Sequence, residues 1–174
     1  MSESTHSSDP LGNSTSTPID GGVRIGHVHL KDADLDRALA FYCGVLGFEV
    51  TQRLGSQAAF ISAGGYHHHI GLNTWESRGG MRPAPGTTGL YHTAILYPTR
   101  AALADALRRL MTASIRLTGA SDHGVSEALY LDDPDGNGVE LYWDRPGADC
   151  TRDGNGNLAM TTARLDLDDL LSKT

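Results

Sequence analysis

The chain has 174 residues, of which 39% are hydrophobic and 20% are charged, so it can form one well-buried domain or two half-domains that share a core. The formal net charge of −7 argues against nucleic acid or an anionic membrane as a partner, because both require a basic surface. No apolar run approaches the roughly 20 residues that span a bilayer, and the first residues lack the basic-then-apolar order of a secretory signal.

The two cysteines, Cys43 and Cys150, lie far apart in the sequence and form no CxxC motif. This usage is typical of a reducing compartment in which both thiols stay free. We therefore expect a cytoplasmic protein without a membrane association.

Both ends of the chain differ in composition from its middle. Residues 1–22 are rich in Ser, Thr, Pro and Gly and are expected to form a disordered tail, because they cannot bury enough surface to offset chain entropy. Residues 147–174 are expected to form a second tail, in which LDLDDLL predicts one short amphipathic helix. The folded domain is expected to span residues 23–146.

The first half of this domain, residues 24–78, predicts the order βαβββ. Asp32 and Asp34 are good N-caps for a helix that carries apolar residues at helical spacing and ends at Gly47. In the first strand, alternation places His27 and His29 on one face. The strands expected in this half are residues 24–31, 48–53, 57–63 and 67–74.

The second half, residues 90–145, repeats this order after a loop rich in Gly and Pro, residues 79–89. Its helix is expected to be capped by Thr99. Its expected strands are residues 90–97, 115–119, 126–132 and 138–143. The sequence therefore predicts an α+β fold made of two βαβββ modules.

The repeat places His27 and His92 at equivalent positions, each the third residue of a short motif (IGH and LYH) in its module's first strand. Glu140 lies between Val139 and Leu141 and is expected to point inward, where a carboxylate needs a partner or a cation. Two imidazoles and one carboxylate from separate strands form the facial triad of non-haem Fe(II) oxygenases. The sequence therefore predicts a metal site at His27, His92 and Glu140.

The paired modules with IGHVHL, YHTAI and DPDGNGVEL resemble the vicinal oxygen chelate (glyoxalase/bleomycin resistance/dioxygenase) superfamily, over about residues 24–145. LGFE and DPDGN are shared across that superfamily. YHHHIGLN and DHGVS, followed by Tyr130, are more specific and resemble the type I extradiol, catechol 2,3-dioxygenase-like enzymes.

This resemblance implies an enzyme that cleaves the ring of a catechol with O₂. His27, His92 and Glu140 match the iron ligands of the family, and Mn(II) suits the same ligands. The cofactor is therefore expected to be Fe(II), with Mn(II) as an alternative.

The resemblance also implies three catalytic side chains. His68 matches the acid/base residue, Tyr130 the residue that hydrogen-bonds the substrate hydroxyl, and His123 a second histidine beside the substrate. Strict strand alternation would place His67 and His69 opposite His68, so the sequence leaves open which of the three faces the metal.

Two other functions are compatible with the same fold. A glyoxalase-like isomerase or thiol transferase usually needs a carboxylate ligand on the last strand of the first module, and HHHIGLNT contains no acid. A non-catalytic antibiotic-binding protein generally lacks the metal ligands. The sequence leaves the oligomeric state open, with a homodimer through sheet edges as one arrangement.

Overall fold

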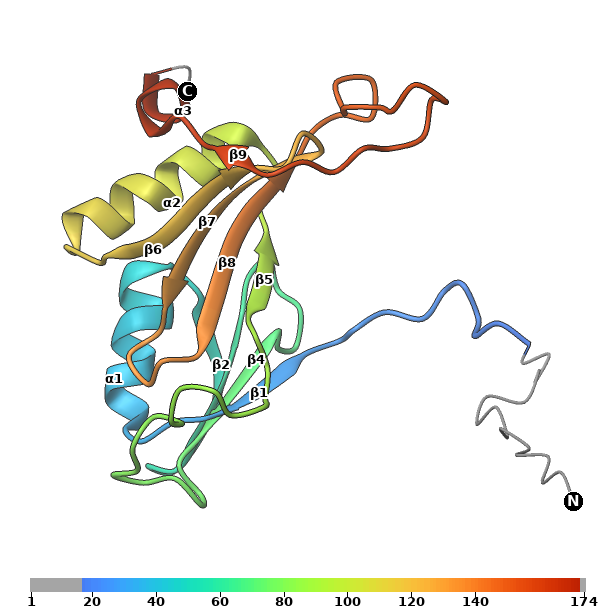
Figure 1. Cartoon of the computed structure of the whole chain (residues 1–174). Helices are drawn as coiled ribbons and strands as arrows, with labels where there is room; N and C mark the ends of the chain where they lie inside the picture. Colours follow the sequence, from blue (N-terminus) through green and yellow to red (C-terminus); the bar gives the residue numbers. More distant parts are fainter. Residues whose placement is uncertain (1–16, 173–174) are drawn as a thin grey trace, which may run out of the picture.

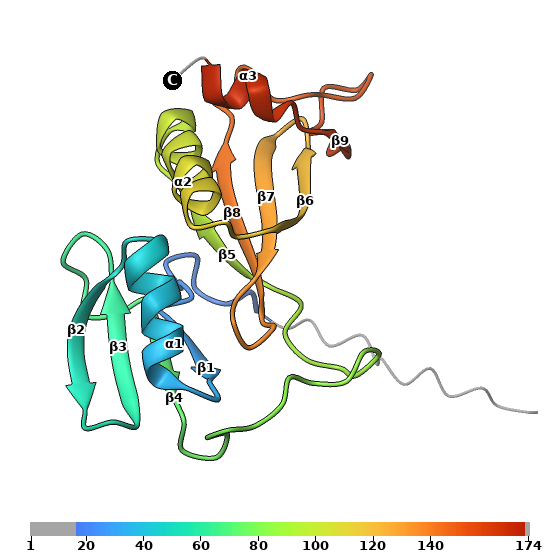
Figure 2. The same ribbon diagram turned by 90° about the vertical axis from the view of Figure 1, so that its left-hand side faces the viewer.

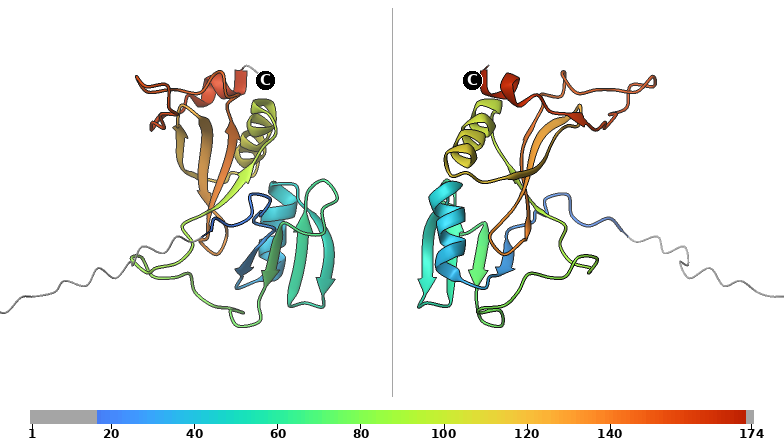
Figure 3. Two further views of the ribbon diagram at one scale, coloured as in Figure 1. Left: turned by 90° about the vertical axis from the view of Figure 1, so that its right-hand side faces the viewer. Right: turned by 60° about the vertical axis from the view of Figure 1, so that its left-hand side comes forward.

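A computed structural model describes residues 17–172 of the chain. It contains a four-stranded sheet in the order β1-β4-β3-β2 and a five-stranded sheet in the order β5-β8-β7-β6-β9 (Figure 1). Figure 3 shows the two sheets one above the other, joined by the loop that separates the modules. The predicted α+β fold of two βαβββ modules is confirmed.

In the first module, the helix begins where its capping signal indicates, and β2 and β3 begin within one residue of the predicted strands. Asp34 caps the helix, because its side chain accepts a hydrogen bond from the Arg37 N–H at 3.0 Å. The helix continues as π-helical turns, which residue spacing did not predict, and Gly47 follows with φ of +89°. The elements are β1 (Val28–Lys31), α1 (Leu35–Leu39), η1 (Ala40–Val45), β2 (Glu49–Leu54), β3 (Ala58–Ser62) and β4 (Ile70–Asn73).

The second module repeats this order and adds a strand and a helix. Thr99 caps its helix through a hydrogen bond from the Ala102 N–H at 3.1 Å. The elements are β5 (Thr93–Leu96), α2 (Arg100–Thr112), β6 (Leu117–Asp122), β7 (Ser126–Asp132), β8 (Gly138–Asp144), β9 (Ala163–Arg164) and α3 (Leu167–Ser172). In the part of the chain that the structure describes, no helix has the length and apolar content needed to cross a membrane.

The first strand of each module is shorter than predicted and lies parallel to the last. β1 pairs with β4 from Val28↔Ile70 onward, and β5 pairs with β8 from Thr93↔Val139 onward. Residues 24–27 and 90–92 pair with no strand of the described part of the chain, so the alternation there does not form a ladder, and Ile25 is 91% exposed. The expected strand 67–74 likewise begins only at Ile70, after the three consecutive histidines.

One hydrophobic core contains side chains of both modules. Helices α1 and α2 lie on the same side of the molecule, each against its own sheet (Figure 2). Helix α2 buries Leu103, Leu107 and Leu110. Near the C-terminus, Leu165 and Leu170 are also buried, with α3 packed beside α2.

The two modules also meet through polar groups. Tyr42 of the first module donates a hydrogen bond to Asp133 Oδ2 of the second at 3.1 Å, and Arg37 pairs with Asp135 at 2.5 Å. Both aspartates belong to the DPDGNG turn between β7 and β8. There the Asp133 carboxylate accepts hydrogen bonds from the N–H groups of Asp135 and Asn137. These acids therefore act as turn and junction residues.

Candidate metal centre

His92 and Glu140 lie side by side because β5 runs parallel to β8 with Ala94 opposite Glu140. His92 directly precedes β5, and its Nε2 lies 2.9 Å from Glu140 Oε2. The two side chains are only 30% and 13% exposed. This places an imidazole nitrogen and a carboxylate oxygen next to each other at a partly buried position, which suits two ligands of one metal.

Tyr130 and His123 extend this pair into a chain of hydrogen bonds. Tyr130 lies opposite Glu140 in the β7–β8 ladder, and its hydroxyl donates to Glu140 Oε1 at 3.0 Å. His123 Nε2 lies 2.8 Å from the same hydroxyl. Burial, and then the hydrogen bond to Glu140, raise the pKa of Tyr130 to about 12, so the phenol keeps its proton at neutral pH. His92, His123 and Tyr130 line one cavity of about 600 Å³.

His27 lies with the histidines of the first module. It directly precedes β1, and its ring centroid is 4.4 Å from that of His68. Among the three consecutive histidines, His67 and His69 are exposed, whereas His68 is half-buried and packs against Phe60. Partial desolvation, and then the neighbouring His27, lower the pKa of His68, so its imidazole is neutral at pH 7. His68 is thus the member of the triplet that faces the predicted ligand.

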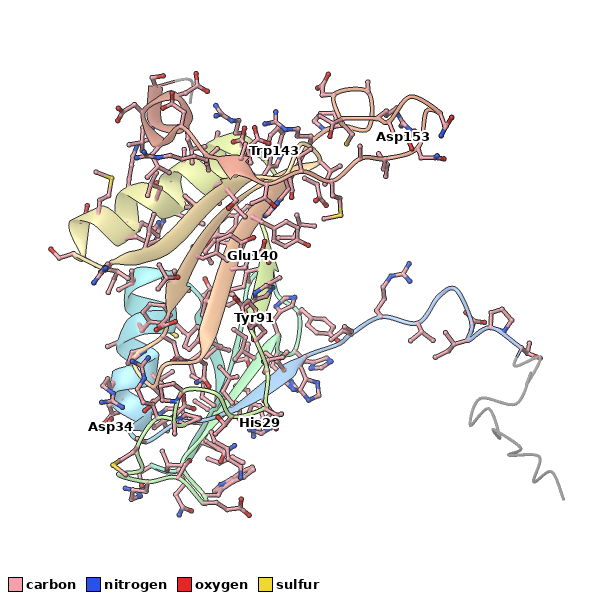
Figure 4. The ribbon with its side chains drawn as sticks, in the orientation of Figure 1. His29, Asp34, Tyr91, Glu140, Trp143 and Asp153 are labelled. Carbon is pink, nitrogen blue, oxygen red and sulfur yellow. The ribbon has the colours of Figure 1, made fainter. Side chains whose placement is uncertain are left out.

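The three predicted ligands do not converge within one chain. Between residues 17 and 172, no three His, Cys, Asp or Glu side chains are placed to hold one ion. His27 and His92 do line the same hollow, of about 700 Å³. In Figure 4, Glu140 on β8 lies well above His29 on β1, with Tyr91 between them. The donor set has the right chemistry for a metal, and His92 Nδ1 is buried without a hydrogen bond among the described residues. In this arrangement, however, His27, His92 and Glu140 are not grouped so as to hold one ion.

One contact of the site has no signal in the sequence. The Thr161 carbonyl oxygen lies 2.9 Å from His123 Nδ1, across 38 residues of chain. Thr161 stands in a segment without regular periodicity, and only the return of the chain to β6 as β9 brings it there.

Residues 24–141 match the model of the Glyoxalase/Bleomycin resistance protein/Dioxygenase superfamily. The chain is 43% identical to the catechol-2,3-dioxygenase of Bacillus subtilis over 158 residues, covering 90% of this chain and 54% of that protein. It is 34% identical to biphenyl-2,3-diol 1,2-dioxygenase 3 of Rhodococcus globerulus, covering 70% of this chain and 63% of the relative. It thus spans between half and two thirds of these relatives' length.

Among solved structures, the lactoylglutathione lyase of Agrobacterium tumefaciens superposes with a TM-score of 0.54 at 26% identity, covering 69% of this chain and 92% of that one. The predicted resemblance to the superfamily is confirmed by the match to its model, which includes both modules and the residues from His27 to Glu140. The chain belongs to the Glyoxalase/Bleomycin resistance protein/Dioxygenase superfamily.

Proposed function

We propose that this chain is an Fe(II)-dependent extradiol dioxygenase that cleaves the ring of a catechol with O₂. The observation that carries the proposal is the series of close contacts His92–Glu140–Tyr130–His123, which joins two metal-type ligands to two polar groups. Three of these side chains, those of His92, Tyr130 and His123, line one cavity. The similarity to a catechol-2,3-dioxygenase and a biphenyl-2,3-diol dioxygenase supports the reaction class. Mn(II) suits the same ligands.

His27, His92 and Glu140 would hold the metal. When bound, the metal would serve as a template for two vicinal substrate oxygens and as the conduit for electrons to O₂. A metal held by these residues would take the place of the contact between His92 Nε2 and Glu140 Oε2, which leaves the hydrogen bond from Tyr130 to Glu140 Oε1 available to orient the carboxylate.

The remaining polar side chains would handle protons and orientation. Tyr130 remains protonated, and its hydroxyl, which donates to Glu140 in the structure, could donate instead to a substrate oxygen beside Glu140. His68 is neutral and can accept a proton from a substrate hydroxyl. Its Nδ1 faces His67 Nδ1 at 2.7 Å, so Nε2 is the nitrogen left for this exchange.

We further propose that a homodimer completes the metal site. His27 and His68 belong to the first module, whereas His92 and Glu140 belong to the second, and one chain leaves the two groups apart. A twofold axis would bring the first module of each copy to the second module of the other and form two complete triads. Ile25 and Leu90 line the hollow that contains His27 and His92 while 91% and 65% exposed, and a second copy would cover them.

A glyoxalase-like isomerase is the second candidate, supported by the structural match to a lactoylglutathione lyase. Such enzymes usually need a carboxylate on the last strand of the first module. The pairing of the first strand with the last can be compared between the modules. Ala94 of β5 lies opposite Glu140 of β8, and at the equivalent position His29 of β1 lies opposite Gly71 of β4. The His29 ring fills the space that a side chain at Gly71 would occupy, so this position of β4 offers no carboxylate as a fourth metal ligand.

The proposed location is the cytoplasm, in keeping with two cysteines, Cys43 and Cys150, that are free in the structure.

The test is anaerobic loading with Fe(II), followed by mixing with catechols in air while O₂ and visible absorbance are recorded. We expect a coloured ring-opened aldehyde and one O₂ consumed per catechol. Resorcinol, whose hydroxyls are too far apart to chelate, is the matched control and should be inert. If iron-loaded protein takes up no O₂ with a broad catechol panel, the dioxygenase proposal is wrong, and methylglyoxal with glutathione becomes the next substrate to assay.

A further inference from the structure

The segment after β8 makes a long excursion before it returns to the second sheet. We call residues 146–164 the C-terminal arm. It projects from the top of the molecule in Figure 1 and folds back through a bridge between Arg152 and Leu158. Figure 4 labels Asp153 at its far end, where the carboxylate accepts the Asn155 and Asn157 N–H groups. The arm then pairs with β6 as β9.

The two ends of the C-terminal arm are firmly attached. Before it, Arg145 donates to Asp122 at 2.8 Å and to the buried Glu127 at 2.9 Å. After it, Leu165 is buried in the core, and Arg100 pairs with Asp169 at 2.9 Å. The arm is therefore held against the loop between β6 and β7, which carries His123.

Thr161 binds His123 twice through its main chain. The Thr161 N–H donates to the His123 carbonyl at 2.9 Å, and His123 Nδ1 lies 2.9 Å from the Thr161 carbonyl oxygen. On either side, Asp122 pairs with Ala163, and the Thr151 N–H donates to the Gly124 carbonyl at 3.0 Å. Three consecutive residues, of which His123 is the middle one, are thus fixed by the arm.

A carbonyl oxygen only accepts hydrogen bonds, so the contact with Thr161 requires a proton on His123 Nδ1. The other ring nitrogen, Nε2, then faces the Tyr130 hydroxyl at 2.8 Å, and that hydroxyl reaches Glu140. In neutral His123, Nε2 is an acceptor and competes with Glu140 for the single hydroxyl proton of Tyr130. The tautomer of His123 therefore decides how Tyr130 can share that proton.

We propose that the C-terminal arm belongs to the catalytic apparatus, with the Thr161 carbonyl as the group that sets the orientation and tautomer of His123. Thr161 is a positioning residue in this assignment, because it acts on the site only through the imidazole. The assignment rests on the proposed function, in which His123 and Tyr130 lie beside the substrate. When a carbonyl or carboxylate accepts a hydrogen bond from one ring nitrogen of a histidine, it fixes the orientation of the ring and the protonation state of the other nitrogen.

The first test reads the His123 ring directly. Ring ¹⁵N chemical shifts are recorded at about pH 8.5, above the ordinary histidine pKa of about 6.5, where imidazoles are neutral. The signal is assigned by its loss in His123→Gln. We expect His123 in the Nδ1–H tautomer in the wild-type protein, and an Nε2–H tautomer would overturn the proposal.

The second test displaces the arm without changing Thr161 or His123. In Gly124→Ala the new β-carbon would overlap the Thr151 side chain, at a residue with φ of +73°. The matched control is Gly55→Ala, which has a φ of +56° and an open surrounding. We expect Gly124→Ala to mix the His123 tautomers, to lower kcat by about 10–100-fold and to keep its iron, because orienting partners usually contribute that much.

The outcomes separate this proposal from the function on which it rests. An unchanged tautomer and unchanged kcat in folded Gly124→Ala would overturn the positioning role. If Gly124→Ala does not fold, the wild-type tautomer still decides the assignment. A wild-type Nδ1–H tautomer without any catechol turnover would refute the dioxygenase function while supporting the contact with Thr161.

Discussion

The two modules share one order of strands but surround their equivalent histidines in different ways. In the first module His27 lies against the ring of His68. On the neighbouring strand β4, the residue opposite His29 is Gly71. In the second module His92 contacts a carboxylate, because the corresponding position is Glu140. The repeat therefore sets where the backbone lies, and the residue on the neighbouring strand determines whether a histidine meets another imidazole or an acid.

The environments of the two groups differ as well. The histidines around His27 are largely exposed and contact one another, whereas Glu140 is mostly buried and connects to Tyr130 and His123. We infer that the two modules have different roles. The second module would hold the metal mainly through preorganised groups, and the first would contribute one ligand and His68, which would exchange protons. Three predictions test this difference and one tests the junction that joins the modules, in order from the largest expected effect to the smallest.

Removing the carboxylate of the second module should abolish metal binding. Glu140→Ala deletes one ligand and also leaves His92 and Tyr130 without their common acceptor. We expect no stoichiometric iron after dialysis, as measured by metal analysis. Glu49→Ala, on the exposed strand β2, is the control and should keep its iron. Iron retained by Glu140→Ala would remove Glu140 from the proposed centre.

Replacing His68, the proposed acid/base of the first module, should affect turnover and not the metal content. His68→Phe keeps the packing against Phe60 and loses proton exchange, so we expect a decrease in kcat of about 10²–10⁴ with unchanged iron. His67→Phe, at an exposed position, is the matched control and should cost far less. A loss of iron in His68→Phe would instead make His68 a ligand.

The junction between the modules should make stability depend on pH. Burial, and then Asp133 and Asp135, raise the pKa of Asp32 to about 7. An ordinary aspartate has a pKa of about 3.9, so the folded state favours the protonated carboxyl. The protonated carboxyl of Asp32 makes its full contribution to the free energy of unfolding below about pH 4. This contribution, at most roughly 4 kcal/mol, is lost as pH rises through about 7.

Urea unfolding between pH 4 and pH 8 measures this dependence. Asp32→Asn should flatten the pH dependence in that interval, because the amide does not titrate. Asp149→Asn, at an exposed position, should follow the wild-type curve. An Asp32→Asn curve parallel to the wild type would show that Asp32 ionises normally in the folded protein.

Removing the Tyr130 hydroxyl should have the smallest effect. In the reaction, Tyr130→Phe removes the hydrogen bond that the hydroxyl would donate to the substrate. A neutral hydrogen bond contributes about 0.5–1.5 kcal/mol, so kcat/KM for a catechol should fall by only about 2- to 13-fold. Iron content should not change. Tyr97→Phe, outside the site, is the control. A complete loss of turnover would give Tyr130 a part in proton transfer that the present roles assign to His68.

Local signals predicted most of the fold, because helix caps, turns and apolar periodicity act over a few residues. Asp34, Thr99 and the DPDGNG turn lie where the sequence indicates, and β7 has the predicted bounds. The early starts predicted for β1 and β5 are wrong because a strand needs a partner, and β4 begins only at Ile70. The π-helical turns after α1 leave no trace in the spacing.

The candidate site was predictable in part for the same reason. The register of β5, β7 and β8 follows from local elements and brings His92, Tyr130 and Glu140 together. The placement of His27 depends on how the modules pack, and the contact of Thr161 with His123 depends on a long return of the chain. Neither is encoded in a short stretch of residues.

In the proposed metal centre, each module supplies a different half of the site, which is completed between two copies of the chain. The direct measurement uses His27→Ala and Glu140→Ala chains, co-expressed with different tags and purified as the mixed dimer. We predict that each variant alone binds no stoichiometric iron, and that the mixed dimer binds one, since one site combines the intact His27 of one copy with the intact His92 and Glu140 of the other. A mixed dimer as empty as its parents, or a His27→Ala protein that keeps its iron, would contradict this account.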